Sequence, residues 1–317
     1  MRAAIIASPL TVEVRHADMP TLKSGEIRVR VQGCGVCGSS IPVWQGRSWF
    51  HYPLEAGAPG HEGWGVVDEV ADDVTPFSPG TRVAFLSDHA YAEYDVAPVE
   101  KAVLLPDALG SFPFPAEPLG CAMNVLERCQ LLAGQSVAIV GIGFLGAVLT
   151  ALAARAGAVV VALSRRKFVL DLAKFLGARD VITLDDTHSA LQCALRCNKG
   201  EGYDCVIEAV GSQEMLDLAT ELTRERGRLV IAGYHQDGLR QVNMQLWNWR
   251  GLDVISAHER DHRVYVRGMQ RAIDAVLNGT LDPRPLFTHR YPLEELSYAF
   301  CDANSRPDGF LKALVMP

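Results

Sequence analysis

The sequence of 317 residues lacks the features that define several classes of protein. It contains no run of about 18 apolar residues, the length that a membrane-spanning helix requires, and its first residues lack the layout of a secretory signal. Acidic residues (37) outnumber lysine and arginine (30), and the net charge of −7 argues against a surface that binds nucleic acid. We therefore expect neither a membrane nor a nucleic acid among its partners.

Disulfide-scaffold spacing is also absent, although the chain contains eight cysteines. Cysteines without such spacing favour a reducing compartment, so we expect a cytoplasmic protein. Nearly half of the residues (49%) are apolar, which is enough for a substantial core. The length suggests about two domains.

A glycine-rich turn is present in the segment VAIVGIGFLG, residues 137–146. A short buried strand is expected before the turn and a helix after it, which is the context of a dinucleotide-binding G-x-G-x-x-G motif. The first glycine permits the tight turn, the second lets a pyrophosphate approach the backbone, and the third lets the helix pack close to the strand. The candidate phosphate-binding residues are Gly141, Gly143, Phe144, Leu145 and Gly146.

The motif alone also fits a turn without a ligand, but the chain that follows it favours the nucleotide interpretation. Expected helices at about 144–156 and 168–177 alternate with expected strands at 159–163, 181–184, 205–209, 228–232 and 253–257. Strands and helices that alternate in this way predict a doubly wound parallel sheet of the Rossmann type. Ala209, Val210 and Gly233 follow two of these strands, and we expect them to contact the cofactor.

The end of the second strand of this region indicates which nucleotide is bound. A site for NAD has an acidic residue about 20 positions after the glycines, where it binds the ribose hydroxyls. This chain has Ser164, followed by Arg165 and Arg166. A hydroxyl and guanidinium groups suit the 2′-phosphate of NADP, which an acid would repel. The alternative is that both arginines are solvated surface charges.

The region before about residue 115 has a different character. Short β segments are expected at 2–8, 26–33, 65–70, 82–86 and 90–96, separated by glycine and proline clusters. This spacing predicts an antiparallel, barrel-like β domain. The chain therefore combines a β-rich part with an α/β part.

Two short segments of the β-rich part contain metal-binding residue types. Cys34-x-x-Cys37 resembles half of a zinc ribbon, but no second cysteine pair follows at a suitable spacing. A redox role would require a thioredoxin-like context, which this region lacks. Cys37 and His61 can instead meet in space as metal ligands, and the alternative is a structural cysteine and a core histidine.

Taken together, the motifs of both parts resemble the zinc-dependent medium-chain dehydrogenase/reductase family, which includes alcohol, sorbitol and threonine dehydrogenases. The resemblance covers essentially the whole chain, and the motifs occur in the family's order. They are GVCGSS (35–40), PGHEGWGVV (59–67), PGTRVAF (79–85), AYAEY (90–94), AEPLGCAMNVL (116–126) and VAIVGIGFLG (137–146). The resemblance implies a GroES-like catalytic barrel, residues 1–118 and 259–317, and a Rossmann domain, residues 119–258.

The resemblance also implies one catalytic zinc ion. Cys37 and His61 match two zinc ligands, and Glu62 matches an adjacent glutamate that exchanges with water at the metal. Glu117 matches the third ligand, which is cysteine in many alcohol dehydrogenases and glutamate in polyol-type members. Cys121 is the competing candidate, because thiolate suits zinc; the match places it one helical turn further on, facing the nicotinamide.

The chain departs from the family pattern near this site. Ser39 matches a hydroxyl that commonly relays the substrate proton, but Pro42 replaces a second relay residue, histidine. Ser40 stands where an aspartate often orients the ligand histidine, so that support must come from elsewhere or be weaker. The lobe with four cysteines is missing at residues 86–89, so a structural zinc is not expected.

These features predict a zinc-dependent oxidoreductase that transfers a hydride between NADP(H) and a secondary alcohol or ketone of polyol, sugar or cyclic type. The alternatives are a zinc-free quinone or ene reductase of the same superfamily and a non-catalytic NADP-binding protein. The resemblance implies a homodimer or homotetramer. Trp44, Phe50, Trp64 and His89 are candidates for the substrate pocket by proximity to the motifs, and equally for core or surface positions.

Overall fold

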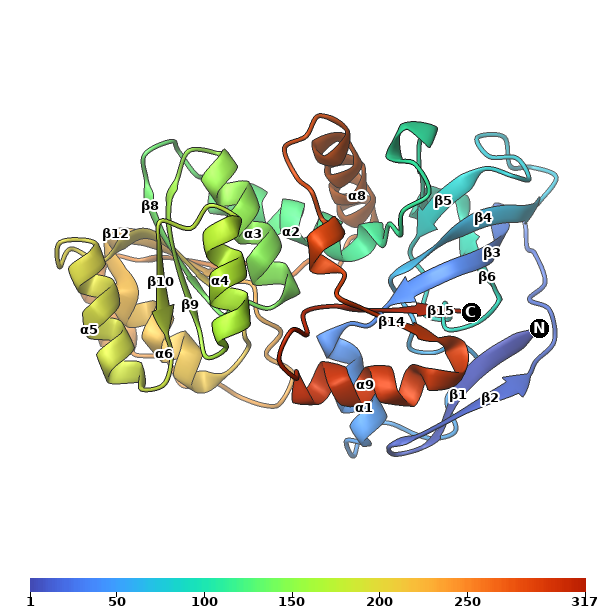
Figure 1. The fold of residues 1–317 in the computed structure, drawn as a ribbon, viewed down its shortest axis with the longest axis horizontal. Helices are drawn as coiled ribbons and strands as arrows, with labels where there is room; N and C mark the ends of the chain where they lie inside the picture. The colour runs from blue at the N-terminus through green and yellow to red at the C-terminus, as the bar shows by residue number, and fades with distance from the viewer. The chain divides into compact units, whose positions relative to one another are not determined.

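The computed structural model describes all 317 residues and divides into two compact units. The first unit comprises Met1–Gly120 and Arg260–Pro317, and the second comprises Cys121–Glu259 (Figure 1). The two boundaries lie two residues and one residue after the expected ones. No helix in the structure has both the length and the apolar character that crossing a membrane requires.

The second unit is built on one six-stranded parallel sheet with the order β10-β9-β8-β11-β12-β13. Its strands are β8 (Ser136–Val140), β9 (Val159–Ser164), β10 (Asp180–Thr183), β11 (Tyr203–Glu208), β12 (Thr223–Ile231) and β13 (Asp253–Ser256). The order reverses beside β8, as in a Rossmann fold, and the predicted doubly wound α/β domain is confirmed. The strand ends beside β8 are therefore the place where a dinucleotide fits.

The helices of the second unit are α3 (Phe144–Arg155), α4 (Lys167–Phe175), α5 (Thr187–Cys197), α6 (Gln213–Leu222) and α7 (Met244–Arg250), and α2 (Ala116–Cys129) begins in the first unit. The structure confirms the two predicted helices as α3 and α4. The prediction omitted α5, α6 and α7, although each has a capping side chain. Asp186, Ser212 and Asn243 accept hydrogen bonds from the first turns of these helices.

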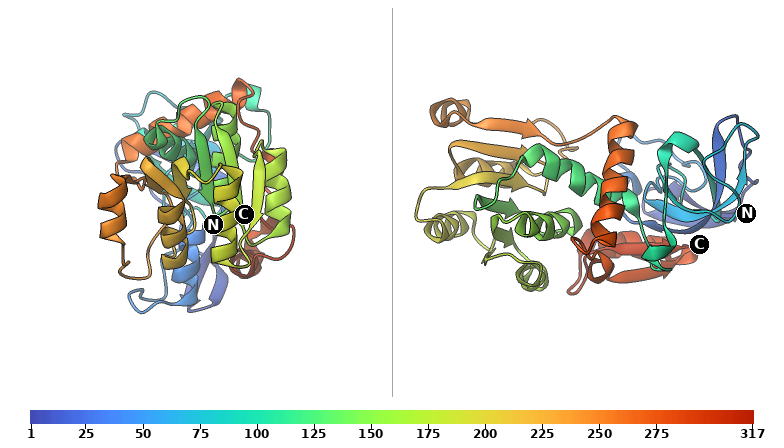
Figure 2. Two further views of the ribbon diagram at one scale, coloured as in Figure 1. Left: turned by 90° about the vertical axis from the view of Figure 1, so that its left-hand side faces the viewer. Right: turned by 90° about the horizontal axis from the view of Figure 1, so that it is seen from above.

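The first unit is β-rich, as predicted, and contains a seven-stranded sheet and a separate hairpin of β1 with β2. Its strands are β1 (Arg2–Ser8), β2 (Thr11–His16), β3 (Glu26–Gly35), β4 (Gly63–Val70), β5 (Arg82–Phe85), β6 (Tyr94–Pro98), β7 (Ala102–Leu104), β14 (His289–Pro292) and β15 (Ala313–Met316). Strand β3 is central, since it pairs with β4, β6 and β15. The chain therefore returns to this sheet at its end (Figure 2).

One predicted strand starts later than expected. The β segment at 90–96 was expected to be continuous, but β6 begins at Tyr94. The backbone N–H groups of Ala90 and Tyr91 instead bond to the carbonyl groups of Gly60 and Gly57. These bonds hold the segment against the loop that precedes β4.

The remaining helical elements of the first unit are short, except for α8. They are α1 (Ile41–Gln45), α8 (His262–Leu277), α9 (Leu296–Ser305) and the 3₁₀ turns η1 (Gly38–Ser40), η2 (Val99–Lys101), η3 (Asp107–Leu109), η4 (Arg284–Leu286) and η5 (Leu293–Glu295). Each unit has its own apolar core. In the first unit, α1 and α9 pack together through Trp44 and Phe300, whose ring centroids are 5.8 Å apart.

Candidate active site

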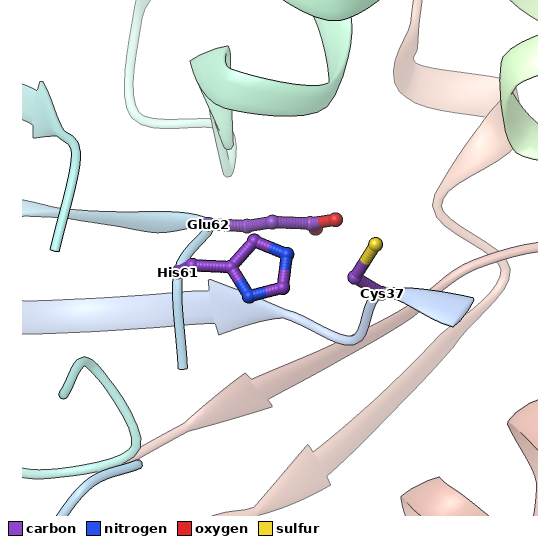
Figure 3. Close-up of side chains that lie close together, drawn as sticks. All are labelled: Cys37, His61 and Glu62. Atoms are coloured by element: carbon purple, nitrogen blue, oxygen red, sulfur yellow. The ribbon is translucent and has the colours of Figure 1, made fainter. Parts of the chain in front are cut away.

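Three side chains of the first unit that could hold a metal ion converge, although they come from separate segments. Cys37 follows β3 and precedes η1, whereas His61 and Glu62 directly precede β4. One possible ligand atom from each residue lies within 4.8 Å of the other two. Figure 3 shows the three side chains pointing toward a common centre. The structure therefore brings together Cys37 and His61, between which η1 and α1 lie in the sequence.

The ring of His61 is oriented by the backbone. Its Nδ1 atom lies 2.9 Å from the carbonyl oxygen of Pro59. A carbonyl can only accept, so Nδ1 carries a hydrogen and Nε2 is the ring atom that a metal would bind. This contact supplies the support that Ser40 cannot provide at the position of an orienting aspartate. The sequence gave no signal for it, because a backbone acceptor has no side-chain signature.

Glu62 has no exposed surface, and its two carboxylate oxygens have different environments. Oε1 accepts a hydrogen bond from the ammonium group of Lys312 at 2.5 Å, whereas Oε2 has no hydrogen-bond partner. Oε2 lies against Gly35, where an added Cβ would come within 1.8 Å of it. A buried carboxylate oxygen without a partner is costly unless it binds a cation.

Sequence reasoning did not identify Lys312, although a signal was present. A lysine within the apolar segment GFLKALVMP is unusual, and Lys312 is only 4% exposed. Burial would lower the pKa of its ammonium group, but the negative charges of Glu62, Cys37 and Glu117 raise it. Lys312 therefore remains a cation beside the site.

The side chains around His61 change the pKa of its ring. Burial opposes the charged ring, but the hydrogen bond and charge of Cys37, with Glu117 and Glu62, raise the pKa of His61 to about 10. Glu117 lies in the first turn of α2, and its negative charge raises the pKa values of both His61 and Lys312. A divalent cation would replace the proton that this negative environment now holds on the ring.

The donor set fits zinc. Thiolate, imidazole and carboxylate are the ligand types that zinc takes, and Glu62 Oε2 is a buried acceptor without a hydrogen-bond partner. As zinc ligands, Cys37 would be a thiolate and Glu62 and Glu117 would be carboxylates, and with the cation Lys312 they would carry two net negative charges, which would balance Zn²⁺. Cys34 is fully buried in the core, and burial raises the pKa of its thiol, so it is suited to packing rather than to ligation.

The hydroxyl group expected to act as a proton relay lies beside the thiol of Cys37. Ser39 Oγ is 3.2 Å from Cys37 Sγ, to which it donates a hydrogen bond. Pro42 is buried at the start of α1 and offers no titratable group. A path for a proton from Ser39 outward is therefore not continued by residue 42.

The four candidates for a substrate pocket have different environments. Trp64 and Trp44 are 1% and 5% exposed, so both are core residues. Phe50 packs against Trp49 near the surface, and His89 contacts Glu55, 2.9 Å from its Nε2 atom.

The glycine-rich turn of the second unit has the geometry expected from its sequence. Gly141 has a φ angle of +99°, which favours glycine, and this confirms the tight turn. A Cβ at Gly146 would lie 2.1 Å from the carbonyl oxygen of Gly141, so α3 packs as close to the turn as predicted. A Cβ at Gly143 would meet nothing within 4 Å, so the space beside this residue, which precedes α3, is open.

Ser164 lies at the end of β9 and is 7% exposed. Its Oγ atom is 3.5 Å from the backbone nitrogen of Arg166, which precedes α4. The guanidinium of Arg165 is 2.8 Å from the carboxylate of Glu214, which also accepts a hydrogen bond from Thr187. Sequence reasoning missed Glu214, because it lies 49 positions from Arg165.

A two-domain chain with a Rossmann sheet and a separate β-rich unit that holds a Cys–His–Glu group has the design of a metal-assisted dehydrogenase. Comparison with known families supports this class. The family model "Zinc-binding dehydrogenase" matches residues 145–276, and "Alcohol dehydrogenase GroES-like domain" matches residues 23–107. The chain therefore belongs to the zinc-type alcohol dehydrogenases of the medium-chain dehydrogenase/reductase family, and these are oxidoreductases.

Individual relatives agree with this assignment. The alcohol dehydrogenase of Geobacillus stearothermophilus is 30% identical over 267 residues, 74% of this chain and 77% of that protein. The sorbitol dehydrogenase of Bacillus subtilis (strain 168) is 25% identical over 351 residues, 100% of this chain and 97% of that protein. A protein of Sinorhizobium meliloti 1021, crystallised with NADP bound, is 25% identical with a TM-score of 0.86, and the match covers 100% of this chain and 99% of that chain.

Proposed function

We propose that the protein is a zinc-dependent dehydrogenase that transfers a hydride between NADP(H) and a secondary alcohol or ketone. The observation that carries the proposal is the convergence of Cys37, His61 and Glu62. The similarity to sorbitol dehydrogenase over the whole chain supports a polyol or a sugar as the substrate class. Carbonyl reduction is the same reaction in the opposite direction.

The roles of the residues follow from their chemistry. When bound, zinc would act as a Lewis acid on the substrate oxygen and lower the pKa of the alcohol. Cys37 and His61 would hold the ion, and Glu117 would be its third protein ligand. Glu62 would exchange at the metal, because one of its oxygens is retained by Lys312 and the other has no partner. Ser39 would accept the substrate proton.

The proposed nucleotide site uses the second unit. The N-terminus of α3, with Phe144 and Leu145 and the backbone of Gly141, Gly143 and Gly146, would bind the pyrophosphate. Ser164, Arg165 and Arg166 would bind the 2′-phosphate of NADP. Ala209, Val210 and Gly233, at the ends of β11 and β12, would contact the nicotinamide half.

The decisive experiment combines metal analysis with an activity screen. Protein purified without added metal should contain about one zinc ion per chain, since there is one ligand group. A panel of polyols, cyclic alcohols and ketones should reveal substrate-dependent absorbance changes of NADP(H). Cys37→Ala or His61→Ala should abolish turnover while nucleotide binding persists. Full activity without zinc would instead favour a zinc-free reductase.

We also propose that the protein forms a homodimer or homotetramer. Strand β13 is the edge of the six-stranded sheet, so its outer backbone groups lack a neighbouring strand. Helix α7 precedes β13 and buries none of its residues, and Trp249 on this helix is 86% exposed. A second copy related by a two-fold axis would pair the two edges and cover both helices.

A reducing, cytoplasmic location is the remaining part of the proposal. All eight cysteines are free thiols, including the exposed Cys301. A protein secreted into an oxidising medium with this arrangement would risk unwanted crosslinks. Thiol titration of protein denatured under anaerobic conditions should count eight thiols per chain.

A further inference from the structure

A buried carboxylate links the ends of two strands in the second unit. Glu208 is the last residue of β11 and has no exposed surface. Its Oε1 atom accepts hydrogen bonds from the backbone N–H groups of Val210 and Gly211, at 2.7 and 2.8 Å. Its backbone carbonyl accepts bonds from Ala232 and Gly233, both at 2.8 Å. One residue therefore shapes the segments that follow both β11 and β12.

The second carboxylate oxygen starts a chain of side chains. Glu208 Oε2 lies 2.9 Å from His235 Nε2, and His235 Nδ1 lies 2.8 Å from Arg240 Nε. Arg240 also donates to the carbonyl oxygen of Gly211 at 2.9 Å and pairs with Asp237, so the hydrogen bonds close into a ring. Because arginine can only donate, His235 must accept at Nδ1 and donate at Nε2. The hydrogen bonds therefore run in one direction, from Arg240 to His235 to Glu208.

The backbone packs closely against this ring of hydrogen bonds. A Cβ at Gly233 would lie 2.6 Å from Glu208 Oε2 and 2.3 Å from the backbone nitrogen of Gly211. The same segment also contacts the glycine-rich turn, since a Cβ at Gly141 would lie 2.3 Å from Val210 Cγ2. The carboxylate ring and the phosphate-binding turn are thus in contact through Val210.

The sheet order places Glu208 at the edge of the sheet where a Rossmann domain binds a dinucleotide. A dinucleotide crosses the carboxyl ends of the strands beside β8, with its adenosine half over β9, where Ser164 lies. The nicotinamide half then lies over the ends of β11 and β12. We infer that Glu208, held by His235 and Arg240, is a positioning residue that fixes Val210, Gly211 and Gly233 for the nicotinamide half. The inference rests on the proposed dinucleotide function.

The direction of the hydrogen bonds makes one conservative substitution disruptive. In Glu208→Gln, the amide nitrogen must face either His235 or the N–H groups of Val210 and Gly211. Either orientation sets a donor against a donor, and a change of His235 tautomer would set Nδ1–H against Arg240. The variant therefore loses the ring while it keeps the size of the side chain.

A substitution of His235, the middle residue, can preserve the direction of the hydrogen bonds from Arg240 to Glu208. In His235→Gln, the amide group can donate to Glu208 and accept from Arg240, as the imidazole does. His235→Leu can do neither. Comparison of the two variants therefore separates loss of hydrogen bonding from loss of volume.

The test compares whole and truncated nucleotides by titration calorimetry. NADPH carries the nicotinamide, whereas 2′-phospho-ADP-ribose lacks it. Glu208→Gln and His235→Leu should raise the Kd of NADPH about tenfold and change the Kd of 2′-phospho-ADP-ribose by less than twofold. His235→Gln should restore the Kd of NADPH to within about threefold of the unmodified protein.

Asp204→Asn is the matched control. Asp204 lies on the same strand at its other end, where it accepts hydrogen bonds from Ser136 and Arg224. This variant should unfold at a lower temperature but bind both nucleotides as the unmodified protein does. Equal weakening of both ligands in Glu208→Gln, or no weakening, would overturn the inference. An unmodified protein that binds neither NADPH nor NADH would instead overturn the proposed function.

Discussion

At the scale of single residues, the third zinc ligand is a choice between two side chains of α2. Glu117 influences the pKa of His61, which places its carboxylate near the metal-binding group, whereas Cys121 falls in the other unit. We expect Glu117→Ala to lose zinc or bind it much more weakly and Cys121→Ser to retain it, as measured by elemental analysis after dialysis. The reverse result would assign the ligand to Cys121.

A second residue-scale prediction concerns Asp95, a buried carboxyl of β6. Burial raises its pKa to about 6 from 3.8, and its Oδ2 atom has no hydrogen-bond partner. The native protein therefore binds this proton more tightly than the unfolded chain, so stability falls as pH rises from about 4 to 6. The cost above pH 6 is on the order of 3 kcal/mol. Asp95→Asn should raise the melting temperature at pH 7.5 and have no effect near pH 4.

Asp73 supplies a control in which the change in melting temperature should have the opposite sign. Its exposed carboxylate accepts hydrogen bonds from Ser24 and Gly25, which lower its pKa. A lowered pKa stabilises the native state above the unfolded value of 3.8, and this contribution is lost as pH falls. Asp73→Asn should therefore lower the melting temperature at neutral pH. The same sign for both variants would contradict the assignment.

At the scale of elements, the end of β9 and the start of α6 together determine the nucleotide preference. Glu214 in the first turn of α6 holds Arg165, and its negative charge would oppose a 2′-phosphate. We expect the unmodified protein to prefer NADPH to NADH. Loss of a charge-assisted contact costs about 1.5–3 kcal/mol, or roughly ten- to hundredfold. Ser164→Asp with Arg165→Ala should narrow or reverse the preference in kcat/KM, and Glu214→Gln should increase it.

Another carboxylate of α6 provides the control for this comparison. Glu221 lies near the end of the same helix and pairs with Arg250. Glu221→Gln removes the same charge away from β9 and should leave the ratio of kcat/KM values unchanged. Equal kcat/KM for NADPH and NADH in the unmodified protein would refute the assigned preference.

The elements also show what local sequence can and cannot predict. Strand β1 has the predicted bounds, and α3 ends within one residue of its predicted end, because apolar periodicity and glycine signals are local. The predicted start of β6 was wrong, since Ala90 and Tyr91 donate hydrogen bonds to carbonyl groups that lie 30 and 34 positions away in the sequence. The same limit applies to the site: motifs identified Cys37 and His61, but not the partner of Glu62, which is 250 positions away.

At the scale of the whole molecule, self-association can be tested on one exposed aromatic residue. Trp249→Glu places a charge on the face proposed to meet a second copy, so it should shift the mass measured by light scattering to a smaller species. Phe175→Glu is the control, because Phe175 is 77% exposed at the end of α4, in the same unit. An unmodified protein that is monomeric at micromolar concentration would contradict the proposed dimer.

The main-chain carbonyl of Pro59 that holds His61 limits how point mutations can alter the support of this histidine. No side-chain substitution deletes a main-chain oxygen, so point mutation cannot remove this support while the loop keeps its path. A carbonyl is also uncharged, so the bound ion would be less neutralised than beside an aspartate. The ion would therefore polarise the hydroxyl group of a bound alcohol more strongly, and the pKa of that alcohol would be lower. With Ser40 in place of an aspartate, a bound zinc ion would thus be more electrophilic, and its histidine ligand would be held by an acceptor that no side-chain substitution removes.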